Sequence, residues 1–182
     1  MNSPTTTRQK ILETAVSIVD TQGAGHLTID AVAAAAGLSK GGVLYHFPSK
    51  RALLEAMLAL LMETSAERIQ KLREEPQAQL QPTLGPMIQA EQEQQPKQRA
   101  MALAILAAGA EDPTLLNPAK AFIADRFREA GSHTTDPQLA HILLLAAEGL
   151  RFLDMLNLIP EEIANREDFF DRLLQLARKL PR

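Results

Sequence analysis

Apolar residues recur every three to four positions through most of the sequence, which is the spacing of amphipathic α-helices. In residues 7–22 the recurring residues are Ile11, Leu12, Ala15, Ile18 and Val19. Similar series predict further helices over residues 28–36, 39–47, 50–74, 97–110, 113–130, 138–158 and 161–180. We find no strand-like alternation and no internal repeat. The sequence therefore predicts an all-α protein of about nine helices.

The stretch between the predicted helices over residues 50–74 and 97–110 is rich in proline and glutamine. Pro76, Pro82 and Pro86 interrupt it, and residues 89–98 are rich in glutamine. We interpret the glutamine-rich part as a polar helix face or a loop.

Two short helices joined at Gly37 form the most informative part of the sequence. Thr28 precedes the first helix as an N-cap, and its capped N-terminus is also suited to receive a phosphate. Ser39 opens the second helix, and Phe47-Pro48 ends it. This layout is typical of a helix-turn-helix, whose second helix enters the DNA major groove.

The second helix carries two adjacent glycines, which each cost a helix roughly 1 kcal/mol relative to alanine. The major groove is about 12 Å wide, so backbone approaches base edges closely only where side chains are small. Ser39, Gly41 and Gly42 provide such small side chains. We infer that these glycines serve close approach to DNA rather than helix stability.

Residues 28–50 read T-I-D-A-V-A-A-A-A-G-L-S-K-G-G-V-L-Y-H-F-P-S-K. They resemble the DNA-binding segment of TetR/AcrR-type one-component regulators, and the resemblance extends over residues 5–60. It implies that Tyr45 and His46 lie near the DNA backbone and that Lys50, at a helix N-terminus, binds phosphate. Many family members have a tyrosine where this chain has Leu44, so Tyr45 and His46 are left to make that contact.

Base recognition has few candidates in this segment. The resemblance implies that four residues face the groove, namely Ser39, Lys40, Gly41 and Gly42. Because glycine has no side chain, only Lys40 and Ser39 remain as side chains that could contact base edges. We therefore expect DNA shape to supply part of the specificity. The expected DNA-binding set is Thr28, Ser39, Lys40, Gly41, Gly42, Tyr45, His46 and Lys50.

Charge and composition indicate how the domains are organised and to which class of protein the chain belongs. The net charge is −3, yet residues 1–52 hold five Lys and Arg against three acids, so an acidic remainder carries −5. We expect a DNA-binding head in residues 1–50 and an acidic body in residues 51–182. Cysteine is absent and no apolar run approaches the roughly 20 residues of a membrane span, so we expect a cytoplasmic protein without disulfides.

An enzymatic reading has little support. The sequence has no cysteine nucleophile, no glycine-rich phosphate loop and no HExxH motif. Its four histidines, at positions 26, 46, 133 and 141, lack the spacing of metal ligands. We expect no catalysis, no metal and no cofactor.

The body offers apolar and aromatic residues at helical spacing, which line either an ordinary core or a ligand pocket. His141 is the most specific of these candidates, because a histidine among apolar residues would give a pocket one polar anchor for a ligand. We favour the alternative, in which His141 lies in a core or an interface and hydrogen-bonds to the protein itself. The candidate ligand-binding residues are Met87, Met101, Ile105, Phe122, Phe127, His141 and Phe152.

The last two predicted helices have more apolar surface than one core easily uses, with small residues that allow close helix approach. We expect them to pair with a second copy in a four-helix bundle, as the resemblance also implies. The candidate dimer residues are Leu143, Ala147, Leu150, Phe169, Leu173 and Leu176. Glu148 and Arg151 either hydrogen-bond at that seam or form an exposed pair of little energetic value.

Together these features predict a homodimeric transcriptional repressor that binds a pseudo-palindromic operator in double-stranded DNA. A small hydrophobic or amphipathic effector in the body would release it. The alternative from another class is a helical dimer that binds a protein partner or shapes DNA without a small-molecule effector. Steep salt dependence together with sequence preference would distinguish the regulator from this alternative.

Overall fold

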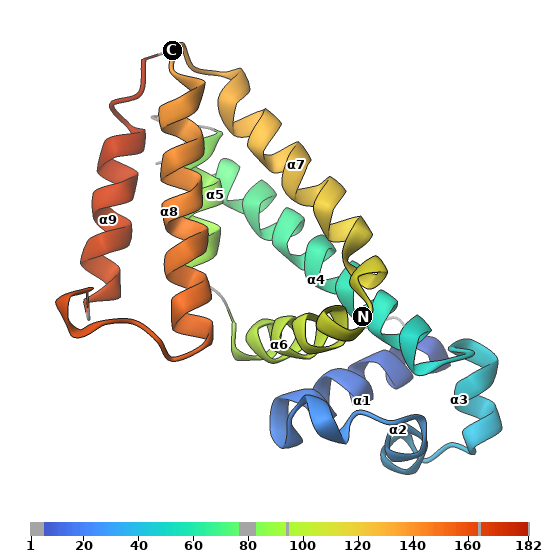
Figure 1. Cartoon of the computed structure of the whole chain (residues 1–182). Coiled ribbons are helices and arrows are strands. Elements are labelled where there is room, and N and C mark those ends of the chain that lie inside the picture. The colour runs from blue at the N-terminus through green and yellow to red at the C-terminus, as the bar shows by residue number, and fades with distance from the viewer. Residues whose placement is uncertain (1–5, 77–82, 94, 164, 182) are drawn as a thin grey trace. The chain divides into compact units, whose positions relative to one another are not determined.

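The computed structural model describes residues 6–76, 83–93, 95–163 and 165–181, and within these ranges the chain forms nine α-helices (Figure 1). This confirms the predicted all-α class. The helices are α1 (Thr7–Gln22), α2 (Ile29–Ala36), α3 (Lys40–His46), α4 (Lys50–Arg73), α5 (Leu84–Gln92), α6 (Pro96–Glu111), α7 (Asn117–Ser132), α8 (Pro137–Met155) and α9 (Arg166–Ala177). None of the helices in the described ranges is long and apolar enough to cross a membrane.

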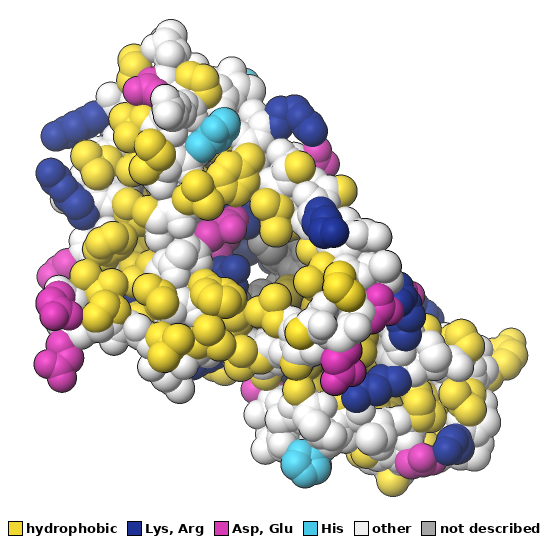
Figure 2. All heavy atoms as spheres, in the orientation of Figure 1, with side chains coloured by type: hydrophobic (Ala, Val, Ile, Leu, Met, Phe, Trp, Pro, Cys, Tyr) yellow, Lys and Arg dark blue, Asp and Glu magenta, His cyan; other side chains and the backbone are white. Residues whose placement is uncertain are grey.

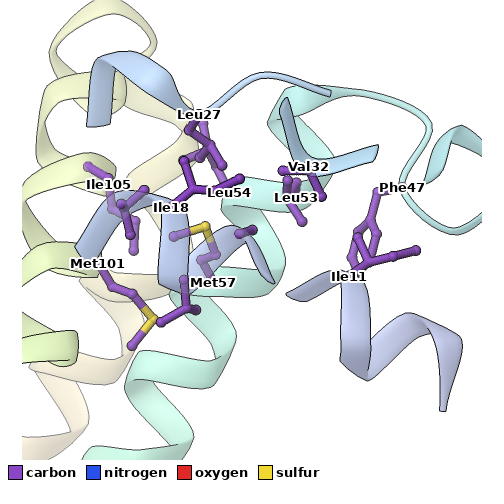
Figure 3. Close-up of a cluster of buried hydrophobic side chains, with 14 of the residues drawn as sticks. Ile11, Ile18, Leu27, Val32, Phe47, Leu53, Leu54, Met57, Met101 and Ile105 are labelled. Atoms are coloured by element: carbon purple, nitrogen blue, oxygen red, sulfur yellow. The ribbon is translucent and has the colours of Figure 1, made fainter. Parts of the chain in front are cut away.

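The chain divides into two compact units, and it passes from the first to the second within α4. The first unit contains residues up to 62 together with residues 95–119. Its core joins side chains of α1 to α4 with side chains of α6, as Figure 3 shows. Ile11 lies beside Phe47 and Val32 beside Leu53 in this core. Burial of these apolar side chains fixes the positions of the three short N-terminal helices.

The boundary expected after residue 50 does not coincide with the boundary of this unit. Helix α6 packs against α1, and its Met101 and Ile105 are buried in the same core. Three short helices offer too little surface to bury Ile18 and Met57 by themselves, so α6 completes their core.

The second unit contains residues 63–94 and 120–182, with α5, α7, α8 and α9. Helix α5 packs against both α8 and α9, and its Leu84, Met87 and Ile88 are fully buried. The apolar pattern predicts no bounds for this helix, because prolines interrupt the stretch and its glutamine-rich part fits either a polar helix face or a loop. Pro86 lies in the first turn of α5, where a missing backbone N–H breaks no intrahelical hydrogen bond.

The end of the chain also differs from the prediction. The expected helix over residues 161–180 is a short 3₁₀ turn at Glu161–Ile163 followed by α9, which begins only at Arg166. Pro160 and the acidic pair do start a helical turn, but it is not continued into α9. Buried Phe170, Leu173 and Ala177 hold α9 in the core of this unit.

Candidate nucleic-acid interface

Helix α3 is held by its cap and by apolar anchors rather than by intrinsic helix stability. The Ser39 hydroxyl accepts a hydrogen bond from the Gly42 N–H at 3.0 Å and so caps the N-terminus. Val43 and Phe47 are buried in the core of the first unit. Lys40 and Gly41 are exposed on the outside of the helix. The fold therefore presents the small and polar residues of α3 to solvent.

The turn before α3 depends on one glycine. Gly37 ends α2 in the left-handed conformation, with φ 67° and ψ 37°, which glycine adopts without steric cost. The Gly37 N–H donates to the Ala34 carbonyl at 3.3 Å, and the Leu38 N–H donates to the Ala33 carbonyl at 2.9 Å. These two bonds form a Schellman motif. The motif fixes the angle at which the chain enters α3.

The N-termini of α2 and α4 in the same unit are also capped. The Thr28 hydroxyl accepts from the Ala31 N–H at 3.0 Å at the start of α2. The Ser49 hydroxyl accepts from the Ala52 N–H at 3.1 Å at the start of α4. Thr28 and Lys50 are exposed at these two ends, where helix dipoles favour an anion.

Tyr45 and His46 end α3. Tyr45 is 85% exposed, and its ring meets that of His46 edge-on with centroids 5.1 Å apart. A large aromatic side chain that is so exposed contributes little to the core. The exposed residues of the predicted DNA set are Thr28, Ser39, Lys40, Gly41, Tyr45 and Lys50, while Gly42 and His46 are half-buried.

The structure adds charged contacts to this surface that the sequence reading missed. Lys40 Nζ lies 3.0 Å from Asp30 Oδ2, and both side chains are well exposed. Because an exposed pair is worth at most about 1 kcal/mol, a phosphate or base could replace Asp30 at little cost. The Arg8 guanidinium lies 4.9 Å from the centre of the Phe47 ring, next to the end of α3. No spacing signal in the sequence links either pair.

Arg51 forms ion pairs with two carboxylates of the protein. Its Nε donates to Glu55 at 2.8 Å, and its guanidinium also pairs with Asp112 at the end of α6. The Thr114 hydroxyl and N–H donate to the Asp112 carboxylate, and these bonds, together with Arg51, lower the pKa of Asp112. Lys50 is therefore the better candidate for phosphate at this helix end.

The predicted ligand-binding residues are divided between the two units. Met101 and Ile105 are buried in the first core, and Met87 is buried in the second. Phe122 and Phe127 are half-buried on α7, whereas Phe152 is exposed on α8.

His141 joins two helices of the second unit. His141 Nε2 lies 2.9 Å from the Phe127 carbonyl oxygen, and the two rings pack with centroids 5.6 Å apart. The carbonyl accepts a hydrogen bond from this nitrogen, which fixes α8 against α7. The structure thus favours the interpretation in which His141 makes its hydrogen bond within the protein over the one in which it anchors a ligand.

The predicted dimer residues have different environments. Leu143, Ala147, Leu150 and Leu173 are buried within the second unit, whereas Phe169 and Leu176 are half-buried. A separate row of α8 side chains is exposed, and its spacing of three and four residues places it on one face. This exposed α8 face consists of Ile142, Leu145, Gly149, Phe152 and Leu156. Figure 2 shows hydrophobic side chains gathered over α8.

Glu148 and Arg151 belong to a buried charge cluster with Glu91 of α5 and Arg126 of α7. Glu91 Oε1 accepts from Arg126 Nη2 at 2.6 Å, and Glu91 Oε2 lies 2.5 Å from Arg151 Nε. Glu148 Oε1 lies 3.0 Å from Arg126 Nη1. Glu148 and Arg151 had suggested an intersubunit or exposed pair, because the sequence does not show that α5 and α7 bring the other two charges beside them.

Within the described ranges, no three His, Cys, Asp or Glu side chains are grouped so that they could hold a metal ion. The cluster just described contains only two carboxylates, and both face guanidinium groups.

Family models match two parts of the chain. A model described as "Bacterial regulatory proteins, tetR family" matches residues 11–57, and one described as "Tetracyclin repressor-like, C-terminal domain" matches residues 76–178. The HTH-type transcriptional regulator SrpR of Pseudomonas putida is 40% identical over 53 residues, which are 29% of this chain. That alignment spans 25% of the length of SrpR, so SrpR as a whole is not a guide to this chain.

Solved structures share the fold over nearly the whole chain. A transcriptional regulator from Rhodococcus sp. Rha1 has a TM-score of 0.71 at 18% identity, covering 95% of this chain and 94% of its own. The multidrug binding protein EbrR complexed with ethidium has a TM-score of 0.67 at 21% identity, covering 97% of this chain and 100% of its own. At such identities the likeness shows the fold alone.

Proposed function

Because the chain belongs to the TetR family of DNA-binding transcriptional regulators, we propose that it is a homodimeric repressor released from its operator by a small hydrophobic effector. The observation that carries the proposal is the capped, exposed surface of α3. Regulators of this family are not enzymes, as the sequence indicated. A cytoplasmic location follows from the proposed role, since the operator is there.

The DNA-contacting part of the proposal rests on where the polar groups of the first unit lie. Lys40 and Gly41 face outward from α3, and Tyr45 extends from its end. Capped N-termini at Thr28 and Lys50 offer backbone N–H groups and a favourable dipole to phosphates. In this arrangement phosphate contacts fix the register while α3 reads the groove.

The dimeric part rests on the exposed α8 face. Leu145 is 57% exposed and Ile142 is 54% exposed, and such a continuous apolar face on a helix is costly in water. A second copy of the same face would cover it symmetrically, with Phe169 and Leu176 of α9 at its border. Two heads then reach half-sites about 34 to 36 Å apart, or slightly more, on a pseudo-palindromic operator.

The effector part is supported by the half-buried aromatic residues Phe122 and Phe127 of α7. The fold neighbour EbrR is a multidrug binding protein that has been solved with ethidium. We propose that the present chain likewise takes a small hydrophobic or amphipathic molecule. Such a molecule can change DNA affinity only if it binds the DNA-free and DNA-bound states with different affinity.

Selection of duplexes from a random pool by the purified protein tests the proposal. We expect an enriched pseudo-palindrome, bound about a thousandfold more tightly than random duplex at the same salt concentration. Tyr45→Ala and Lys50→Ala should bind the selected operator more weakly while keeping the fold, because both side chains are exposed and are placed at phosphates. Enrichment of no sequence, or undiminished operator affinity in these variants, would contradict the regulator function.

A further inference from the structure

The ion pair between Asp30 and Lys40 places a carboxylate on the surface that the proposed function turns toward DNA. Asp30 lies in the first turn of α2, and Lys40 is the first residue of α3. Their side chains are 70% and 59% exposed, and Lys40 Nζ lies 3.0 Å from Asp30 Oδ2. These are the only formally charged side chains of residues 28–47 when histidine is neutral. The two short helices therefore contribute no net charge to the attraction of DNA.

Stability of the free protein does not account for both charges of the pair. A cation at a helix N-terminus opposes the helix dipole, so Lys40 does not stabilise α3. Asp30 favours the N-terminus of α2, but next to DNA its carboxylate is repelled by the phosphates. The ion pair between two exposed side chains contributes little by itself. A ligand that offers both a hydrogen-bond acceptor and a donor would account for both charges.

The major-groove edge of a base pair offers such an acceptor and donor close together. In a G·C pair the cytosine N4 amino group donates to guanine O6, and N–H···O bonds of this kind are about 2.9–3.0 Å long. The second hydrogen of N4 and the second lone pair of O6 face the groove. Asp30 Oδ2 is the oxygen bound to Lys40, which leaves Oδ1 to accept from N4 while Lys40 Nζ donates to O6. The ion pair thus fits the edge without separating.

The groups on either side of these two atoms favour G·C over A·T. Guanine has a second acceptor, N7, next to O6, and an ammonium group has three donors to serve both. In an A·T pair the donor is adenine N6, whose neighbour N7 would repel the carboxylate. The acceptor there is thymine O4, and the methyl group beside it would take water from the ammonium.

We propose that Asp30 and Lys40 together read one G·C base pair in each half-site of the operator. The Lys40 ammonium contacts guanine O6 and N7, and the Asp30 carboxylate contacts the cytosine N4 amino group. Asp30 is then a specificity-determining residue supplied by α2, beside the recognition helix. The inference rests on the proposed regulator function and names a base pair of its operator.

Transfer of Lys40 from Asp30 to a phosphate is the alternative. The Asp30 carboxylate would then lie close to the DNA without its cation, where the phosphates repel it. Contact with cytosine instead gives the carboxylate two partners. The alternative predicts that removal of Asp30 raises the affinity for every DNA sequence alike, whereas the proposal predicts a change at one base pair.

Operator affinities measured at single base pairs distinguish the two. The purified full chain selects its operator from a random pool, and each G·C pair of the half-site is then changed to A·T. Fluorescence anisotropy at one salt concentration gives the affinities of the wild type, Asp30→Ala and Asp20→Ala. Asp20→Ala is the matched control, because it removes an exposed carboxylate from α1 of the same unit. Thermal unfolding verifies that each variant folds.

The expected result is confined to one position. Changing one G·C pair should weaken wild-type binding about 10- to 100-fold. In Asp30→Ala that loss should be smaller by about fivefold or more, while the losses at the other positions stay as they are. The affinity of Asp30→Ala for random duplex should rise, because a negative charge has been removed. Asp20→Ala should keep the full preference for the G·C pair.

A modified cytosine tests the contact without any change to the protein. N4-methylcytosine still pairs with guanine, but a methyl group replaces the amino hydrogen that faces the groove. In the G·C pair identified above it should weaken wild-type binding about tenfold, and it should weaken Asp30→Ala much less. The same modification at another G·C pair of the duplex is the control. If Asp30→Ala does not fold, the wild-type comparison of modified positions decides alone.

Four results would overturn the inference. These are a selected half-site without a G·C pair, an unchanged preference in Asp30→Ala, an affinity gain in Asp30→Ala that is equal for all sequences, or no loss from N4-methylcytosine at any position. A role of Asp30 limited to the N-terminus of α2 gives the second result, and transfer of Lys40 to a phosphate gives the third. A protein that selects an operator but gives one of these results remains a regulator that reads its site through other residues. Enrichment of no sequence contradicts the regulator function itself.

Discussion

Replacement of Gly41 by alanine separates helix stability from DNA recognition in α3. Gly41 does not need a positive φ, because in the described residues only Gly23 and Gly37 among the glycines adopt one. A Cβ built on Gly41 would meet only the Ser39 hydroxyl, at 4.0 Å. The free protein therefore has both the space and the backbone conformation for alanine at this position.

The two consequences of Gly41→Ala have opposite signs. In the free protein alanine should stabilise the helix by about 0.5–1 kcal/mol, which raises Tm by roughly 1–4 °C for a chain of this size. In the complex the added methyl group would lie between α3 and the groove. Forcing a methyl into a packed contact costs about 1–3 kcal/mol, so operator affinity should fall roughly 5- to 150-fold.

Differential scanning fluorimetry and fluorescence anisotropy with the selected operator, at one fixed salt concentration, measure both effects. Gly42→Ala is a less clean probe, since its Cβ would lie 3.3 Å from the capping hydroxyl of Ser39. A stabilised Gly41→Ala with undiminished operator affinity would refute the view that this glycine exists for close approach.

Four further substitutions test the charges, the dimer and the cluster. Lys50→Ala should reduce the slope of log affinity against log salt by about 1, measured by anisotropy titrations, because it removes one phosphate contact. Leu145→Glu should shift the protein toward monomer in analytical ultracentrifugation with little loss of stability, whereas buried Leu143→Ala should cost about 2–5 kcal/mol of unfolding free energy in urea. The pKa of Glu148 is raised by desolvation in the folded protein, so folded molecules bind more protons than unfolded ones. Unfolding free energy should thus fall as pH rises above the ordinary carboxyl value of 4.5, and Glu148→Gln should remove this part of the pH dependence.

Local signals in the sequence were sufficient for the helix-turn-helix. Caps at Thr28 and Ser39, the glycine turn at Gly37 and the stop at Pro48 all act within a few residues, so they can be read without the fold. The same holds for the all-α class, since helical periodicity is a local property. The structure confirms these elements almost residue for residue.

Helix α5 shows where prediction from the local sequence fails. Its prolines interrupt the apolar pattern and its glutamines fit either a polar helix face or a loop, yet Met87 and Ile88 bury their side chains against α8 and α9. That burial stabilises the helix more than its composition disfavours it, and it depends on neighbours that are distant in the sequence. For the same reason, the sequence could not show that α6 completes the core around α1.

The sequence by itself determined the type of each well-patterned helix, the caps and turn around α3, and the residues that could face DNA. Tertiary structure alone decided which side of α8 is buried, and it turned Leu143 inward while leaving Leu145 in solvent. It also brought Glu91 and Arg126, from two other helices, to Glu148 and Arg151. The physical reason is range: caps and periodicity act over one or two helical turns, whereas burial and charge pairing depend on which helices meet.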